Sequence, residues 1–133
     1  MSDPRPTVLV IDDEPLVGRS IRRVLEQTSD VTVVNSGRQA LALFAEGRRY
    51  EVVLCDLTMP EIDGVTVYEK VRAADPVQAE QFVFISGGVF TLRARSFVQA
   101  VEGRCLEKPF DMKRVREVVA DMATRARERR SAA

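Results

Sequence analysis

The sequence predicts an α/β fold, a doubly wound parallel sheet with helices on both faces. Two observations lead to this prediction. Short apolar segments alternate five times with segments of helical spacing along the 133 residues, as in parallel strands joined by right-handed helical crossovers. The apolar segments are also nearly continuous in apolar character, which indicates strands that are buried on both faces.

Five strands are expected from the apolar segments. They span Thr7–Ile11, Val31–Val34, Glu51–Cys55, Gln81–Ile85 and Arg104–Glu107. The first four are rich in Val, Ile and Phe, which fit the half-buried surface of a sheet. The fifth is weaker and follows mainly from its place in the alternation.

Five helices are expected after these strands, because apolar residues recur there at i, i+3 and i+4. They span Leu16–Thr28, Gly37–Glu46, Gly64–Ala74, Thr91–Val101 and Asp111 to about Arg129. Residues that can cap a helix stand at the start of three of them: Ser36, Asp63 and Asp111. Three prolines are assigned to loops: Pro60, Pro76 and Pro109.

Length and composition indicate one domain over residues 1–133, with a core at about 7–122 and a helix end or tail at 123–133. Lys plus Arg and Asp plus Glu both number 20, so a nucleic-acid partner or an anionic membrane surface is not expected. No apolar segment approaches the roughly 20 residues of a membrane span, and no hydrophobic signal region opens the chain. We therefore expect a cytoplasmic protein.

The last predicted helix ends in a basic segment with four arginines between Arg125 and Arg130. A solvated helix end is the first interpretation, because the helix dipole favours cations there. A linker or a contact with a partner is the second.

Acidic, hydroxyl and basic residues follow four of the predicted strands at their carboxyl ends. They are Asp12, Asp13 and Glu14 after the first strand, Asp56 after the third, Ser86 and Gly87 after the fourth, and Lys108 after the fifth. A doubly wound sheet binds its ligands at this edge. We therefore expect one site there.

The residue types at this edge predict a chemistry. Clustered carboxylates suit a hard cation such as Mg²⁺, and Asp56 can attack phosphorus as a nucleophile. Lys108 and Ser86 can contact phosphoryl oxygens. The sequence has no histidine, which excludes histidine-based catalysis and places the chain at the carboxylate end of any phosphorelay.

Four motifs carry a resemblance to the receiver domain of two-component response regulators, including single-domain chemotaxis regulators. They are VLVIDDEP at Val8–Pro15, VVLCDLTMPEIDG at Val52–Gly64, FISGG at Phe84–Gly88 and LEKPF at Leu106–Phe110. Asp13, Asp56, Ser86 and Lys108 follow one another at spacings of 43, 30 and 22 positions. The resemblance covers about residues 7–122.

The resemblance implies a flavodoxin-like three-layer (βα)5 sandwich with strand order 2-1-3-4-5. It implies that Asp56 is the phosphoacceptor and that Asp12, Asp13, Asp56 and the backbone carbonyl of Thr58 hold Mg²⁺. Ser86 would be the switch hydroxyl. Lys108 would contact the phosphoryl group, and the Lys108–Pro109 bond would be cis.

The resemblance also implies partners. A histidine kinase or histidine phosphotransfer protein would donate the phosphoryl group. A downstream protein would bind the fourth predicted helix, the fifth strand and the fifth helix. The protein would be a phosphoacceptor without enzymatic turnover, a monomer or a weak phosphorylation-dependent dimer, and either free-standing or part of a hybrid kinase.

Cys105 departs from the family pattern, which often has Tyr or Phe three residues before the lysine. A thiol cannot report the switch through a large ring movement, and Phe90 is the expected substitute. Cys55 and Cys105 should lie on strands about 10 Å apart, beyond the roughly 7 Å that a disulfide can bridge between Cα atoms.

Two alternative functions remain open. A haloacid-dehalogenase-type phosphatase would share the nucleophilic Asp, Mg²⁺ and Lys, but it needs an acid where this sequence has Thr58. A docking domain that works without phosphorylation stays open mainly because of Cys105, although degenerate receivers usually lose an acid or the lysine and this sequence has them all.

Overall fold

The computed structural model describes residues 5–87, 92–101 and 104–132. Its strands are β1 (Thr7–Ile11), β2 (Asp30–Val34), β3 (Val52–Asp56), β4 (Phe82–Ser86) and β5 (Cys105–Glu107). Its helices are α1 (Pro15–Leu25), α2 (Gly37–Ala45), α3 (Gly64–Ala74), α4 (Pro76–Ala79), α5 (Leu92–Ala100) and α6 (Met112–Ala132). No helix in these ranges combines the length and the hydropathy that a membrane span requires.

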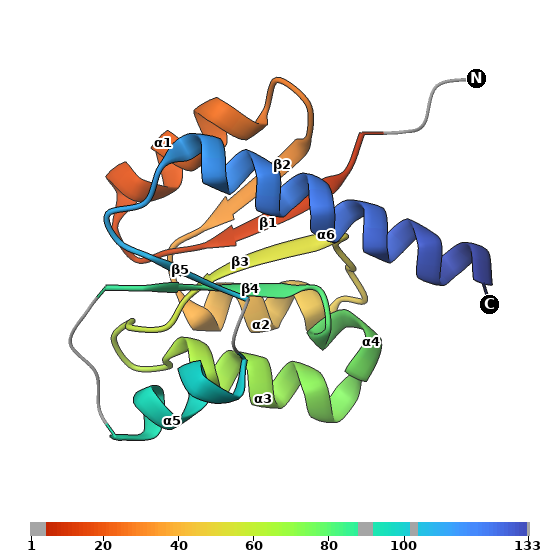
Figure 1. Ribbon diagram of the computed structural model, residues 1–133. Helices are drawn as coiled ribbons and strands as arrows, with labels where there is room; N and C mark the ends of the chain where they lie inside the picture. The colour runs from red at the N-terminus through yellow and green to blue at the C-terminus, as the bar shows by residue number, and fades with distance from the viewer. Residues whose placement is uncertain (1–4, 88–91, 102–103, 133) are drawn as a thin grey trace.

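The strands form one parallel sheet in the order β2-β1-β3-β4-β5. The predicted fold class and strand order are thus confirmed. Helices α1 and α6 cover one face of the sheet, and α2, α3, α4 and α5 lie on the other (Figure 1). This is the three-layer arrangement that continuous apolar strands require.

Alternating side chains of each strand supply two separate cores, because successive residues of a strand point to opposite faces. Leu9, Val53 and Phe84 belong to the core beneath α2 and α3. Val10 and Leu54 belong to the core beneath α1 and α6. All five side chains are fully buried, so both faces of the sheet contribute to stability.

The predicted helix caps are present. Ser36 Oγ accepts the Gln39 N–H at 3.1 Å, and Asp63 Oδ1 accepts the Thr66 N–H at 2.8 Å. Asp111 Oδ1 accepts the Lys113 N–H at 2.9 Å. Each satisfies a backbone donor that the first helical turn leaves without a partner.

The assignment of Pro76 to a loop was wrong. Pro76 opens the short helix α4, which Asp75 caps by accepting the Gln78 N–H at 3.1 Å. A proline at the first helical position sacrifices no hydrogen bond. Four residues are too few for helical periodicity to show.

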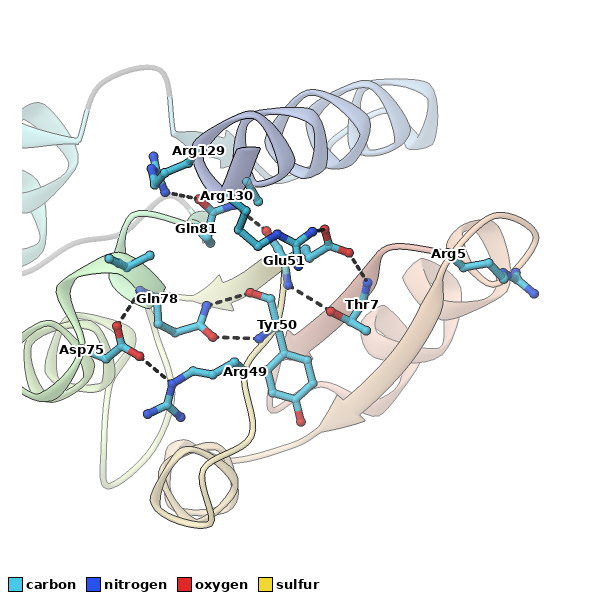
Figure 2. A pocket seen from close by; sticks show the side chains of 12 residues that line it. Arg5, Thr7, Arg49, Tyr50, Glu51, Asp75, Gln78, Gln81, Arg129 and Arg130 are labelled. Carbon is cyan, nitrogen blue, oxygen red and sulfur yellow. Dashed lines mark hydrogen bonds and ion pairs between the residues drawn. The ribbon is translucent and has the colours of Figure 1, made fainter. Parts of the chain in front are cut away.

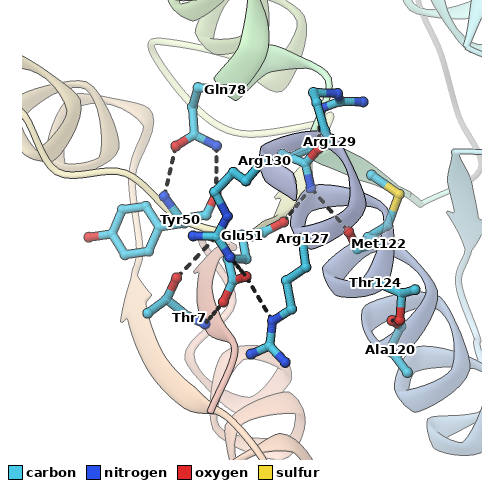
Figure 3. Close-up of polar contacts among 11 residues, drawn as sticks. Thr7, Tyr50, Glu51, Gln78, Ala120, Met122, Thr124, Arg127, Arg129 and Arg130 are labelled. Carbon is cyan, nitrogen blue, oxygen red and sulfur yellow. Dashed lines mark hydrogen bonds and ion pairs between the residues drawn. The ribbon is translucent and has the colours of Figure 1, made fainter. Parts of the chain in front are cut away.

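The basic segment at the end of α6 was predicted to be solvated. Arg125, Arg129 and Arg130 are exposed, as predicted, whereas Arg127 is half-buried. Three of these arginines also make polar contacts with other side chains. Arg127 and Arg130 donate to Glu51 Oε2 at 3.2 and 2.7 Å (Figure 3). Arg129 donates to Gln81 Oε1 at 2.7 Å. Glu51 and Gln81 directly precede β3 and β4. The helix therefore continues across the sheet and ends in a polar network at its amino edge, a contact that local helical patterning does not reveal.

Candidate functional site

The predicted site residues meet at the carboxyl edge of the sheet. Asp12 directly follows β1, Asp56 ends β3, and Ser86 ends β4. Lys108 directly follows β5, and its backbone N–H donates to the Ser86 carbonyl at 2.8 Å. Because parallel strands end at the same edge, side chains far apart in sequence come together here.

Three carboxylates form a cluster at this edge. One oxygen each from Asp12, Asp13 and Asp56 lies within 4.8 Å of the others. Asp12 and Asp56 are buried, with 1% and 2% of their surface exposed. Two backbone donors orient them: the Glu14 N–H binds Asp12 Oδ1 at 2.9 Å, and the Thr58 N–H binds Asp56 Oδ1 at 3.0 Å.

Burial makes this cluster electrostatically unfavourable when it is charged. It raises the pKa of Asp56 to about 7. The Thr58 N–H and Lys108 oppose this rise, and the charge of Asp12 adds to it. Burial also raises the pKa of Asp12 above its usual value, so at neutral pH the cluster favours a positive neighbour.

The donor set fits a hard divalent cation. Asp12 Oδ2 is buried and accepts no hydrogen bond from the described residues, and three crowded carboxylates supply the oxygen ligands that such ions prefer. A cation would offset both the repulsion and the burial of charge. Thr58 lies in the loop after β3, two residues beyond Asp56, and its N–H donates to the Asp56 carboxylate.

Lys108 brings a positive charge to the cluster. Its Nζ lies 3.1 Å from Glu14 Oε1, 3.5 Å from Asp12 Oδ2 and 3.7 Å from Asp56 Oδ2. Burial lowers the pKa of Lys108, but the hydrogen bond to Glu14 and the charges of Asp56 and Asp12 outweigh this and raise it overall. The Lys108–Pro109 bond is cis, as predicted.

Ser86 is buried, with 1% exposed surface, and its Oγ has no hydrogen-bond partner among the described residues. A buried hydroxyl without a partner is costly, which is consistent with a group held ready for a ligand. Gly87 is exposed, and a Cβ added there would meet none of the described residues within 4 Å. Gly88 and Phe90 lie outside the described residues.

Cys105 is half-buried, pairs with Phe84 across β4 and β5, and packs against the core beneath α3. Both cysteines are free, as expected from their separation. Aromatic rings nearby come from other positions: the Phe97 centroid lies 4.8 Å from that of Phe84 and 5.3 Å from that of Tyr68. Sequence reasoning missed this cluster because its members are far apart in the chain.

Gly64 is a further site residue to which the sequence assigned no role. A Cβ at this position would lie 2.2 Å from the Asp56 carbonyl oxygen and 2.8 Å from Leu57 Cα. The Gly64 N–H donates to the Leu57 carbonyl at 3.1 Å. The start of α3 therefore packs directly against the backbone that carries Asp56, where only glycine fits.

Comparison with known protein families gives a match over most of the chain. The family model of the response regulator receiver domain matches residues 8–120. The sensor kinase CckA of Brucella abortus is 32% identical over 118 residues, which make up 87% of this chain and 12% of the kinase. The two-component response regulator ORR3 of rice (Oryza sativa) is 29% identical over 107 residues, which make up 80% of this chain and 76% of ORR3.

The chain thus spans about an eighth of CckA, and it spans about a third of the nitrate/nitrite response regulator NarL of Escherichia coli. Among solved structures, the signal receiver domain of a putative LuxO repressor protein from Vibrio parahaemolyticus shares the fold, with a TM-score of 0.82 at 21% identity over 97% of this chain and 98% of that chain. The receiver domain of the Francisella response regulator 1452 has a TM-score of 0.78 at 25% identity, over 91% of this chain and 98% of that one.

Proposed function

This chain belongs to the response regulator receiver domain family, and on that premise we propose that it accepts a phosphoryl group on Asp56 with Mg²⁺ bound beside it. The observation that carries the proposal is the placement of Asp56. Its carboxylate is buried at the end of β3, inside a cluster of three acids and 3.7 Å from the Lys108 ammonium. A buried nucleophile next to a cation is suited to phosphoryl transfer.

In the proposed reaction a carboxylate oxygen of Asp56 attacks the donor phosphorus. An O–P bond forms to Asp56, the bond between phosphorus and the leaving atom of the donor breaks, and its electron pair stays on the leaving group. Lys108 and the Ser86 hydroxyl would bind phosphoryl oxygens as their charge develops. Asp12, Asp13, Asp56 and the Thr58 carbonyl would hold Mg²⁺, which when bound supplies positive charge to the phosphoryl group.

The proposed donor is a histidine kinase or a histidine phosphotransfer protein in the cytoplasm. The product carries about −1.5 to −2 charges at this site, and we propose that this change alters a surface formed by α5, β5 and α6 that a downstream protein binds. The shallow burial of α5 supports this proposal, since Phe97 and Val98 pack against the core but are only partly buried. Its described residues include no fully buried side chain, and Arg93 ties it to Asp63 and Glu69 through exposed ion pairs.

Intact-mass measurement with acetyl phosphate tests this function. We expect the wild-type protein to gain one phosphoryl group only when Mg²⁺ is present, and the Asp56→Asn variant to gain none. A folded wild-type protein that stays unmodified would contradict the proposal and favour the docking domain that Cys105 suggests. Continuous hydrolysis of the donor at enzyme-like rates would instead favour a phosphatase.

A further inference from the structure

Glu14 stands beside the acid cluster without belonging to it. It is the residue before α1, and its backbone holds this place: its N–H donates to Asp12 Oδ1 and its carbonyl accepts from Val17 and Gly18. Its side chain is 61% exposed. The carboxylates that converge are those of Asp12, Asp13 and Asp56, so the Glu14 side chain has no part in the proposed Mg²⁺ site.

The Glu14 carboxylate instead makes the shortest contact to Lys108. The Nζ–Oε1 distance of 3.1 Å is that of a hydrogen bond. The distances from Nζ to Asp12 and Asp56 are longer, at 3.5 and 3.7 Å. The Lys108 ammonium is therefore hydrogen-bonded to Glu14 at the rim of the site, while it stays within ion-pair distance of Asp12 and Asp56.

We propose that Glu14 is a positioning residue that holds Lys108 in the unphosphorylated protein and so reduces its availability to an incoming phosphoryl group. This inference rests on the proposed function. Lys108 must leave Glu14 to bind phosphoryl oxygens, and it does so because a phosphorylated Asp56 carries about twice the negative charge of the carboxylate. The contact with Glu14 thus opposes the movement of Lys108 to the phosphoryl oxygens.

Glutamine at position 14 separates this role from the backbone role. The Glu14→Gln substitution keeps the N–H that orients Asp12 and removes only the carboxylate charge. Glu107→Gln is the matched control, because Glu107 is exposed, lies next to Lys108 in the chain and makes no contact with Nζ among the interactions described. Because the Glu14–Lys108 pair is partly exposed, we expect effects of about two- to fivefold.

The first measurement needs no phosphorylation. The chain has three lysines, Lys70, Lys108 and Lys113, so limited acetylation with acetic anhydride in Mg²⁺-free buffer, followed by peptide mass spectrometry, contains its own references. We expect Glu14→Gln to raise the reactivity of Lys108 relative to the other two lysines, and Glu107→Gln to leave it unchanged. Unchanged Lys108 reactivity in Glu14→Gln would overturn the proposal.

The second measurement is the acetyl phosphate dependence of phosphorylation at saturating Mg²⁺. We expect Glu14→Gln to lower the KM for acetyl phosphate, and the same substitution in a Lys108→Met background to leave KM unchanged, since a double-mutant cycle isolates the coupling of the two side chains. An equal decrease of KM in both backgrounds would show that the negative charge of Glu14 acts on the phosphodonor without Lys108, and this would overturn the proposal. If wild-type protein took up no phosphoryl group, the proposed function would fail, and the acetylation result would still decide whether Glu14 holds Lys108.

Discussion

At the residue scale, the chemistry proposed for Asp56 and the surroundings of its carboxyl group favour different protonation states when no cation is bound. The proposed chemistry needs an ionised carboxylate, while burial and the neighbouring Asp12 favour the neutral form. Lys108 supplies one positive charge, which it shares among three carboxylates. The site therefore has excess negative charge at neutral pH, and the repulsion and burial of this charge lower the free energy of unfolding.

The first prediction is that Asp56→Asn stabilises the protein when Mg²⁺ is removed. An amide has nearly the shape of the carboxylate but no charge to repel Asp12, so we expect the free energy of unfolding at neutral pH to rise by about 1–3 kcal/mol. Urea denaturation in EDTA measures this. Asp121→Asn, at an exposed position of α6, is the control, and a destabilised Asp56→Asn protein would contradict the prediction.

The second prediction concerns Gly64. Gly64→Ala places a Cβ against the backbone of Asp56 and Leu57, so the loop after β3 must move. We expect a loss of about 1–3 kcal/mol in unfolding free energy, and a decrease in the rate of Asp56 phosphorylation. Gly87→Ala is the matched control because the added Cβ meets no atom of the described residues within 4 Å. Equal stability of the two variants would show that the loop yields without cost.

Much of the site could be predicted from the residues that follow each strand. The carboxyl ends of parallel strands lie at one edge of the sheet, independently of the loop conformations. This placed Asp12, Asp56, Ser86 and Lys108 together. It could not reveal that Glu14 contacts Lys108, since that depends on a side-chain rotamer. Nor could it reveal the tight fit of Gly64, which depends on how α3 packs on the loop after β3.

At the element scale, the longer helices and the strands were predicted because their apolar periodicity extends over enough residues. The strand boundaries differ by one residue at β2, β3, β4 and β5, since hydrogen bonding and not side-chain character sets them. Helix α4 escaped prediction because its four residues are fixed by a cap and a proline. Asp75 therefore largely determines where this element begins.

The third prediction is a pH-dependent role for Asp75. The Gln78 N–H and the Arg49 guanidinium, 2.6 Å from Oδ2, lower the pKa of Asp75 (Figure 2). The folded protein therefore binds the proton less readily than the unfolded chain, and this stabilisation is complete above the unfolded pKa of about 3.9 and lost as the pH falls through the lower folded value.

Asp75→Asn isolates this charge, because Asn is an equally good cap. We expect the variant to be less stable than wild type by about 0.5–1 kcal/mol at pH 7, with the difference disappearing as the pH approaches 2. Urea denaturation across this range measures both curves. A difference that stays constant with pH would show that the cap geometry, and not the charge, is responsible.

At the scale of the whole molecule, the two edges of the sheet have different tasks. The carboxyl edge holds the acid cluster, while polar side chains close the amino edge. There Gln78 exchanges two hydrogen bonds with the backbone of Tyr50, at 2.7 and 2.9 Å (Figure 2). Gln81 donates to the carbonyls of Glu51 and Met122 at 2.6 and 3.2 Å. Helix α6 spans both edges, from the residues after Lys108 to this network.

The network has a consequence for the whole chain because Glu51 and Gln81 directly precede the strands that end in Asp56 and Ser86. Arg127 and Arg130 both bind the Glu51 carboxylate, which is only 13% exposed (Figure 3). Ala123 and Ala126 pack the same part of α6 into the protein. Residues 121–132 at this end of α6 lie beyond the segment that the family model matches, yet Met122, Ala123 and Ala126 among them are buried.

The last prediction is that Glu51→Gln loosens this end of α6. The substitution removes the charge that two guanidinium groups share in a largely buried position, so we expect a loss of about 1–3 kcal/mol in unfolding free energy. The substitution should also accelerate amide hydrogen exchange in residues 121–132 more than in residues 112–120. Glu80→Gln is the control, because Glu80 is 56% exposed and its ion pair is with Arg129, and exposed pairs contribute little. If amide exchange stays unchanged in Glu51→Gln, apolar packing alone holds the end of α6. If exchange becomes faster only in residues 121–132, the amino edge of the sheet fixes α6 independently of the site at the other end of the helix.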